Sequence, residues 1–333
     1  MKREFDLIEK IADPDNLRLA FYKARKRKDA KKSVIDYCAN LDTKLLELRK
    51  ELLCGEVEVG NYHYFKIFDP KERLICAAPF KQRVLHHALM NICHDNFEKF
   101  QIHHSYASRL NKGTYAGIKQ AQVNQQKYRW FLKLDVRKYF YSIDQAVLKE
   151  MLDRRFKDKR LLHIFSSIID SYNAVPGKGV PIGNLTSQYF ANHYLAHADH
   201  FVKEKLGVPA YVRYMDDMVL WANDKELLLQ FGKEFQRFIN EFLLLTLKPF
   251  TLNSTLKGLP YCGYVLSKNT IHINQRSRKR FLKKLNIYNF KLNSLQWSQE
   301  EYQKHMLPLL AFTQKADSIN FRKKYISETM IME

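Results

Sequence analysis

Apolar residues recur at helical spacing along much of the chain. Near its start, Asp13 can cap a helix that begins at Pro14. The same periodicity predicts helices over residues 82–100, 145–156, 161–171, 186–205 and 225–244, and a Lys- and Arg-rich helical region from Asn274 onward. Strand-like patterns lie between these helices, over residues 57–78 and 128–136.

Acidic residues lie at the ends of two of the apolar strand patterns. The strand at residues 128–136 contains Asp135, and residues 211–221 form two apolar runs around Met215, Asp216 and Asp217. The second pattern predicts a β-hairpin with carboxylates at its tip, and another hairpin is predicted over residues 258–273.

Length and composition indicate a globular protein of about two domains, or one enzyme built from several lobes. The chain has 333 residues, of which 46% are apolar and 27% charged. Only 11 glycines and 9 prolines are present, which excludes long flexible linkers. No segment approaches the roughly 18 apolar residues of a membrane span, and no apolar stretch follows the first basic residues as in a signal peptide.

The five cysteines show no CxxC spacing, which disfavours zinc. We expect free, mostly buried thiols in a reducing compartment, and hence a soluble intracellular protein.

A formal net charge of +21 indicates a polyanionic partner, most commonly nucleic acid. The basic residues are spread along the chain, unlike a membrane anchor, although a merely solvated basic surface stays an alternative. Residues 23–32 contain seven Lys or Arg, and this run fits phosphate contacts and a solvated face equally well.

Burying Asp135, Asp216 or Asp217 without a partner would cost several kcal/mol, so a compensating cation is expected. Carboxylates with few nearby histidines favour Mg²⁺, and two such ions suit phosphoryl transfer. The alternative is an ordinary acidic hairpin turn, since Asp is common in turns.

Five motifs in order resemble those of reverse transcriptases. YVRYMDDMVLW contains the YxDD pattern of their catalytic hairpin, and FLKLDVRKYFYSID resembles their first palm strand and helix. RLICAAPFKQRVLHHAL and SYASRLNKGT resemble two fingers motifs, and LPYCGYVL the hairpin before the thumb. The resemblance covers about residues 5–275 and implies an α+β right-hand polymerase fold with fingers, a palm built on an antiparallel sheet and a short helical thumb.

The resemblance implies domain limits of 1–130 for the N-terminal helix and fingers, 131–273 for the palm and 274–333 for the thumb. A fingers insertion at about 150–185 interrupts the palm.

The segment GVPIGNLTSQ indicates a subfamily. Ile182-Gly183 and Ser187-Gln188 stand where most reverse transcriptases have Gln-Gly and Ser-Pro, which resembles the enzymes of diversity-generating retroelements. Ile182 offers only apolar contact to a nascent base pair, so the resemblance implies error-prone copying opposite template adenines. The alternative is that Ile182 only packs between fingers and palm.

The resemblance also implies the metal site. Asp135 would bridge two Mg²⁺ ions, for which Mn²⁺ could substitute, and Asp216 would bind the ion that activates the primer 3′-hydroxyl. Asp217 would support the site, and Val136 would complete the metal-binding set.

Further residues are implied for the nucleotide. Phe140 would exclude a 2′-hydroxyl and so select dNTPs, or else serve as a core aromatic. Arg73 would grip the triphosphate, with Lys66 and Arg83 as weaker candidates, each of which could equally be a solvated charge. Ile182 and Gly183 would line the same pocket, and Lys248 is the candidate general acid for the leaving pyrophosphate.

For the template–primer duplex, the candidate residues come from the catalytic hairpin, the second fingers motif, the segment after Ile182 and the basic run at 275–284: Tyr214, Met215, Arg109, Gln188, Arg278, Lys279 and Arg280.

The implied function is an RNA-directed DNA polymerase that copies template RNA into cDNA, with a small basic helical accessory protein as a further partner and no membrane association. A cytoplasmic location in a prokaryotic cell, or a phage-encoded origin, follows from the resemblance. The alternatives are an accurate retron or group II intron-like enzyme and a catalytically silent RNA-binding scaffold. The intact acidic triad argues against the scaffold.

Overall fold

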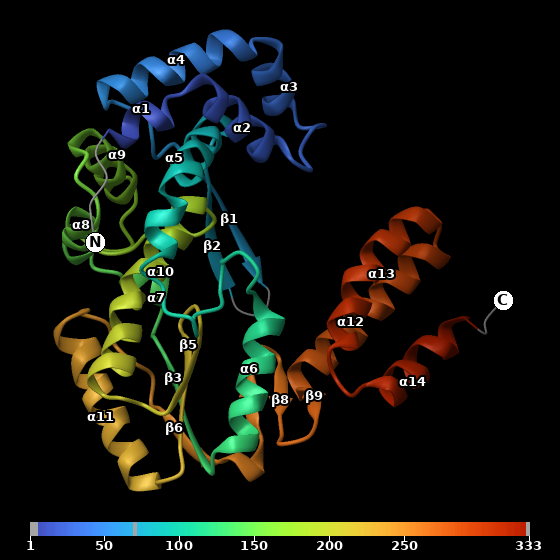
Figure 1. The fold of residues 1–333 in the computed structure, drawn as a ribbon. Helices are drawn as coiled ribbons and strands as arrows, with labels where there is room; N and C mark the ends of the chain where they lie inside the picture. Colours follow the sequence, from blue (N-terminus) through green and yellow to red (C-terminus); the bar gives the residue numbers. More distant parts are fainter. Residues whose placement is uncertain (1–5, 69–71, 331–333) are drawn as a thin grey trace. The chain divides into compact units, whose positions relative to one another are not determined.

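The computed structural model describes residues 6–68 and 72–330 (Figure 1). For residues 326–330 it describes the backbone alone. The chain folds into two compact units that are each built from separated segments. The first unit comprises Met1–His103, Val136–Lys205 and Glu234–Lys248, and the second comprises His104–Asp135, Leu206–Lys233 and Pro249–Glu333. The limits of fingers, palm and thumb stay a prediction.

The first unit is mainly helical. Its elements are α1 (Leu7–Ile11), α2 (Pro14–Arg25), α3 (Lys32–Ala39), α4 (Leu41–Cys54), β1 (His63–Phe68), β2 (Glu72–Ala77), α5 (Phe80–Glu98), α7 (Tyr139–Ser142), α8 (Gln145–Arg155), α9 (Lys159–Asp170) and α10 (Leu185–His200). The predicted start of α2 is confirmed, because the Asp13 side chain accepts hydrogen bonds from the backbone of Asp15 and Asn16, and Pro14 is the first helical residue.

Aromatic side chains join the helices of the first unit. α2 packs along α5, where Phe21 meets Phe80 edge-on with 6.1 Å between ring centroids. The helix predicted to continue to residue 205 instead changes at His200 into a π-helical turn, Phe201–Lys205. Phe201 in this turn stacks on Phe238 at 4.2 Å. β1 and β2 pair antiparallel, and residues 69–71 between them lie outside the described residues.

The second unit contains two antiparallel sheets and a group of helices. Its elements are α6 (Thr114–Lys127), β3 (Trp130–Asp135), β4 (Ala210–Tyr214), β5 (Asp217–Ala222), β6 (Thr251–Ser254), a 3-10 turn (Thr255–Lys257), β7 (Leu259–Tyr261), β8 (Tyr264–Leu266), β9 (Ile271–Ile273), α12 (Gln275–Asn293), α13 (Gln299–Gln314) and α14 (Ile319–Met330). Helix α11 (Lys225–Glu241) begins in this unit and ends in the first.

The larger sheet has the order β4-β5-β3-β6, with β3 between β5 and β6 (Figure 1). On one face, Phe131, Val219 and Trp221 join a buried core with residues of α6 and of the β7-β8-β9 sheet. On the other face Leu132 meets α11, where a Cβ on Gly232 would lie 2.7 Å from a Leu132 methyl carbon. Glycine therefore permits the close packing of this helix on β3.

The predicted hairpin at 258–273 is confirmed and has a third strand, because β8 pairs with both β7 and β9. The basic helix predicted after Asn274 is also confirmed, and Asn274 caps α12 by accepting a hydrogen bond from Ser277. Phe281 and Leu285 of α12 pack with Met306 of α13 in a small separate core.

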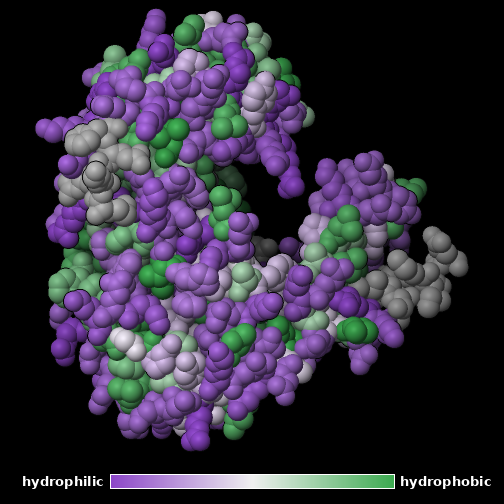
Figure 2. Space-filling model, viewed as in Figure 1, coloured by the Kyte–Doolittle hydropathy of each residue, from purple (hydrophilic) through white to green (hydrophobic). Residues whose placement is uncertain are grey.

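Hydrophilic residues cover most of the visible face (Figure 2). All five cysteines are free. The expectation that they are mostly buried is wrong for Cys38 and Cys54, which lie on the exposed sides of α3 and α4. Among the described residues, no helix has the length and apolar character needed to cross a membrane.

Candidate active site

Two of the three predicted catalytic carboxylates lie directly opposite each other in the larger sheet. Asp135 is the last residue of β3, Asp217 is the first of β5, and the two are paired in the antiparallel register. Because paired residues in a ladder share a face, both carboxylates belong to the face that also bears Phe131 and Val219. The predicted acidic end of the sheet is thus present within the second unit.

The third carboxylate is in the turn between β4 and β5. Tyr214 pairs with Asp217, so Met215 and Asp216 form a two-residue hairpin connection. Met215 has φ 53°, in the left-handed region, whereas Asp216 does not have a positive φ. This combination of signs matches a type II′ turn, whose first position usually holds glycine. Methionine there carries backbone strain of about 1 kcal/mol, a feature often found at functional sites.

Arg213 supports this turn from the preceding strand. Its side chain is fully buried, and Nη1 donates a hydrogen bond of 3.2 Å to the Met215 carbonyl oxygen. Its backbone bonds to the segment before α6, through His104 O at 2.9 Å and Tyr106 N at 3.0 Å. Sequence reasoning missed Arg213, although an arginine between apolar strand residues is a signal, since buried charge requires partners.

The second fingers-like motif also lies beside the hairpin. The Thr114 hydroxyl donates a hydrogen bond of 2.9 Å to the Tyr214 hydroxyl, and Thr114 is the first residue of α6. Arg109 Nη1 donates to the Ser105 carbonyl at 2.7 Å. Of the residues predicted to touch template and primer, Gln188 belongs to the first unit, and the others belong to the second unit with the carboxylates.

Lys133 is a second residue that sequence reasoning missed. Its ammonium nitrogen lies 3.1 Å from each oxygen of the Asp217 carboxylate and donates a hydrogen bond to Oδ2. The same nitrogen donates to the Pro260 carbonyl at 2.6 Å and lies 5.8 Å from the centre of the Tyr261 ring. A lysine two positions before Asp135, inside an apolar strand, is the signal that could have identified it.

Burial raises the pKa of Asp217 to about 6, although the adjacent Lys133 opposes this shift. The nearby carboxylates of Asp135 and Asp216 add to it, because like charges disfavour ionisation. The Asp217 side chain is 25% exposed. The site therefore holds a carboxylate whose charge is costly unless a further cation is present.

These carboxylates fit a divalent ion by their chemistry. All three supply hard oxygen ligands, and Asp217 Oδ1 is a buried oxygen that accepts no hydrogen bond. Within residues 6–68 and 72–330, however, no three His, Cys, Asp or Glu side chains are gathered closely enough to hold a metal ion. Like-charged carboxylates repel one another without a cation, and here Lys133 lies against one of them.

The candidate nucleotide residues belong to the first unit. The Ile182 carbonyl accepts a hydrogen bond of 2.7 Å from Cys76 N, which joins the VPIG loop to β2, the strand that contains Arg73. Gly183 follows with φ 112°, and a Cβ there would lie 2.9 Å from Ile75. The Phe140 carbonyl accepts a hydrogen bond of 2.9 Å from Val180 N. The loop and the candidate gate residue are thus positioned by backbone bonds.

Other candidates in the first unit have more ordinary surroundings. Lys66 is exposed and pairs with Glu72 at 2.8 Å, which raises the pKa of the lysine. Burial lowers the pKa of Arg83 on α5. Val136 is fully buried and forms a bridge with Leu247, next to the partly buried Lys248. Gln188 is partly buried on α10.

The basic residues predicted to bind the duplex lie at the start of α12 in the second unit. Arg278 is exposed, but its guanidinium carbon lies 5.7 Å from the centre of the Phe321 ring of α14. Lys279 and Arg280 are exposed on the same helix. Packing on Phe321 thus gives Arg278 a structural contact in addition to its exposure.

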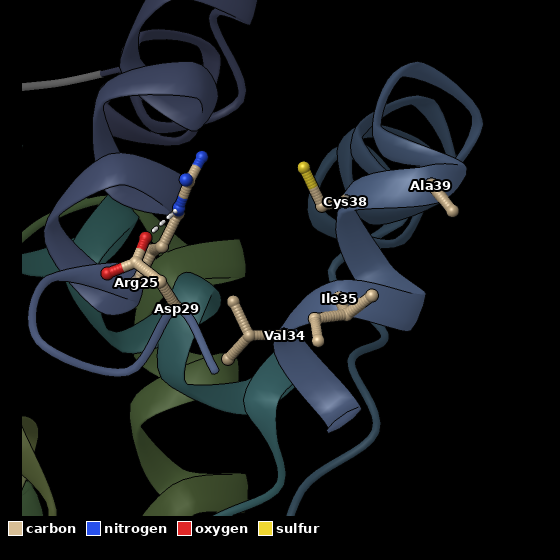
Figure 3. A pocket seen from close by; sticks show the side chains of 6 residues that line it. All are labelled: Arg25, Asp29, Val34, Ile35, Cys38 and Ala39. Carbon is tan, nitrogen blue, oxygen red and sulfur yellow. Dashed lines mark hydrogen bonds and ion pairs between the residues drawn. The ribbon is translucent and has the colours of Figure 1, made fainter. Parts of the chain in front are cut away.

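A surface pocket lies elsewhere, between the end of α2 and α3 in the first unit (Figure 3). Its lining is Arg25, Asp29, Val34, Ile35, Cys38 and Ala39, with the Arg25–Asp29 ion pair on one side. None of the predicted site residues lines it, so this pocket is not the candidate active site.

Comparison with known sequences identifies the family. Residues 69–249, more than half of the chain, match "Reverse transcriptase (RNA-dependent DNA polymerase)". A curated relative is the "Putative COX1/OXI3 intron 2 protein" of Saccharomyces cerevisiae, 24% identical over 153 residues. That match covers 44% of this chain but only 17% of the yeast protein.

Solved structures show the fold. Telomerase from Candida tropicalis has a TM-score of 0.51 at 14% identity, covering 80% of this chain and 59% of that one. Telomerase from Candida albicans, in complex with a fragment of telomeric RNA, has a TM-score of 0.50 at 15% identity, covering 81% and 55%. The predicted right-hand polymerase fold is thereby confirmed. With the sequence match over more than half of its length, this chain belongs to the reverse transcriptase (RNA-dependent DNA polymerase) family.

Proposed function

We propose that this protein is an RNA-directed DNA polymerase that copies a template RNA into cDNA. The observation that carries the proposal is the register that sets Asp135 opposite Asp217, with Asp216 in the strained turn beside them. Reverse transcriptases generally use divalent metal ions, and this family membership makes the three carboxylates the natural ligands.

In this proposal the acidic residues have different roles. Asp135 and Asp216, together with Val136, would hold two Mg²⁺ ions, for which Mn²⁺ could substitute, and Asp217 would support the site. The ions would supply charge neutralisation at the transferring phosphoryl group and activation of the primer hydroxyl. Lys248 stays the candidate donor of a proton to pyrophosphate.

The remaining candidates would bind substrates. Arg73, with Lys66 and Arg83 in weaker roles, would contact the triphosphate, and Phe140 would exclude the 2′-hydroxyl of ribonucleotides. Tyr214, Met215, Arg109 and Gln188 would contact template and primer, and Lys279 and Arg280 of α12, with Arg278, would contact duplex phosphates.

The direct test is primer extension on a heteropolymeric RNA template with Mg²⁺ and dNTPs. We expect extension by the wild type and none by Asp216→Asn. Asp29→Asn is the matched control, because it neutralises an exposed carboxylate in the first unit. Absence of extension by the wild type, even with added cellular partners, would favour the RNA-binding scaffold.

We further propose that the enzyme is of the diversity-generating type and copies template adenines with errors. Ile182 and Gly183 support this, since a backbone bond places their loop against β2 while Ile182 stays partly exposed. Ile182→Gln should then lower the error rate opposite adenine, and Ile35→Gln, at an exposed position on α3, should not. Sequenced products that are accurate in the wild type would instead indicate a retron or group II intron-like enzyme.

A small basic helical accessory protein and a cytoplasmic location in a prokaryotic or phage-infected cell belong to the same proposal. Template RNA could bridge two basic proteins, so the charge of +21 does not oppose such a partner. Copurification that depends on RNA, and is lost after ribonuclease treatment, would support this arrangement.

A further inference from the structure

Lys133 differs from the residues around it in β3. Its neighbours Leu132 and Leu134 are buried and apolar, whereas the Lys133 side chain is only 24% exposed and still carries an ammonium group. Removing such a group from water is unfavourable unless other polar atoms replace the lost hydration. Lys133 shares its face of β3 with the buried Phe131 and with Asp135, so its ammonium group lies between an apolar residue and a carboxylate.

The partners of Lys133 come from two different sheets. The Asp217 carboxylate belongs to β5 of the larger sheet, and the Pro260 carbonyl belongs to β7 of the smaller one. Both contacts are made by the same nitrogen, at 3.1 Å and 2.6 Å. The Tyr261 ring lies alongside, with its own hydroxyl buried. Lys133 therefore spans the junction between the two sheets next to the carboxylates.

The smaller sheet is continuous with the basic helix. Strand β9 ends at Ile273, and Asn274, which caps α12, donates its backbone N–H to the Gly263 carbonyl of the β7–β8 turn at 3.1 Å. Any movement of the start of α12 must therefore involve this sheet. A rigid link from this sheet to Asp217 would fix the position of the carboxylate relative to the start of α12.

We propose that Lys133 is a positioning residue that holds the Asp217 carboxylate in place relative to β7 and thereby to the helix that follows. The inference rests on the proposed polymerase function, because it assigns Lys133 a part in arranging that site. Lys133 acts through Asp217 and does not itself touch substrate.

Two variants of Lys133 test the consequence for synthesis. Lys133→Met removes the charge with little change in shape and should lower the single-turnover rate of nucleotide addition about 10- to 100-fold, because small displacements at a reacting centre have effects of this size. The dNTP KM and the template–primer Kd should stay within about threefold, since the lysine contacts neither. Lys133→Arg keeps a cation and should recover part of the rate.

Lys225→Met is the matched control. Lys225 also lies over an aromatic ring of the second unit, 5.4 Å from the centre of Trp130 at the opposite end of β3. It makes no contact with the carboxylates, so its loss should leave the rate unchanged.

A double-variant cycle with Asp217→Asn separates positioning from general packing. If Lys133 acts through Asp217, Lys133→Met should lower the rate less than about twofold further in the Asp217→Asn background. In urea unfolding of the metal-free protein, Lys133→Met should lower the midpoint of the wild type but not that of Asp217→Asn, in which the ammonium group has already lost its carboxylate partner.

Rate losses that multiply, or midpoint shifts of equal size in both backgrounds, would overturn the assignment. So would a Lys133→Met enzyme in which only template–primer Kd changes. The unfolding cycle does not depend on synthesis, so it tests the link even if the wild type fails to extend a primer, a result that would refute the proposed function alone.

Discussion

The two units bury different kinds of ionisable group. The second unit places Asp217, Lys133 and Arg213 in and beside one sheet, where a carboxylate stays only partly compensated. The first unit buries histidines such as His86 and His193 among helices, and burial lowers their pKa to about 3. Histidines of this kind are neutral and add to packing, whereas the Asp217 carboxylate carries a charge that burial makes unfavourable and that a metal ion could relieve.

In the proposed function, the second unit therefore gives up stability at neutral pH to hold a buried carboxylate, whereas a buried neutral histidine in the first unit costs stability only at lower pH. The predictions below test the contrast, beginning with the largest effect.

The largest effect is expected from Asp135→Asn. The change should lower primer extension on the order of 10³-fold or more, because positioning and charge neutralisation account for most of phosphoryl-transfer catalysis. Thermal stability of the metal-free variant should equal or exceed that of the wild type, since the amide removes like-charge repulsion. Extension within tenfold of the wild type would contradict the role of Asp135.

The hairpin that contains Asp216 and Asp217 was predicted from the sequence and is confirmed, while the catalytic roles of these residues stay a prediction. Apolar runs around Met215-Asp216-Asp217 identify the hairpin, and the reverse transcriptase motifs assign Asp135 as its partner. Lys133 and Arg213 were missed because their roles depend on contacts that no local pattern contains. Lys133 bonds to Asp217 and Pro260, which are 84 and 127 residues away.

In the fold as well, features that depend on neighbouring residues were predicted, and features that depend on residues far apart in the sequence were not. Capping of α2 by Asp13 is a local effect and was predicted. The π-helical turn after His200 was not, and it coincides with the stacking of Phe201 on Phe238, whose ring comes from α11. The third strand, β9, likewise completes a hairpin whose sequence indicated only two strands.

Asp217→Asn should reveal how much the buried carboxylate lowers the free energy of unfolding, because this loss depends on pH. The folded-state pKa of about 6 exceeds the ordinary value, so the native protein binds the proton more tightly than the unfolded chain. The free energy of unfolding of the metal-free wild type should therefore fall as pH rises from about 4 to about 6. Relative to the wild type, the variant should gain up to about 3 kcal/mol at pH 7 and little at pH 4. Equal differences at both pH values, in urea unfolding, would contradict this account.

His193→Leu tests the opposite sign in the first unit. Because burial lowers the pKa of His193 to about 3, the unfolded chain binds the proton more tightly, and stability falls as pH drops below the ordinary value of about 6.5. Between pH 7 and pH 5, this histidine should lower the free energy of unfolding by about 2 kcal/mol. In His193→Leu, the free energy of unfolding should therefore fall by about 2 kcal/mol less over this range than in the wild type.

His63→Leu, at an exposed position on β1, is the control for the histidine experiment and should not flatten the curve. An unchanged pH dependence in His193→Leu would show that His193 is not held neutral.

The smallest effect concerns two basic regions, one in each unit. Replacing Lys279 and Arg280 of α12 with Gln should reduce the salt dependence of template–primer binding. The slope of the logarithm of the binding constant against the logarithm of the salt concentration should be smaller in magnitude by about 1 to 2. Lys31→Gln with Lys32→Gln, in the basic run of the first unit, makes the same charge change. A reduced slope there would favour phosphate contact over a solvated face for residues 23–32, and an unchanged slope in the α12 variant would remove α12 from the duplex site.

The central claim is that the acidic group of the second unit binds divalent metal together with substrates. The most direct measurement is the thermal unfolding midpoint on an RNA template with a chain-terminated primer and the matching dNTP, with and without Mg²⁺. We predict that Mg²⁺ raises the midpoint of the wild type and that Asp135→Asn loses this gain while still binding template–primer. The same Mg²⁺-dependent rise in both proteins would contradict the account.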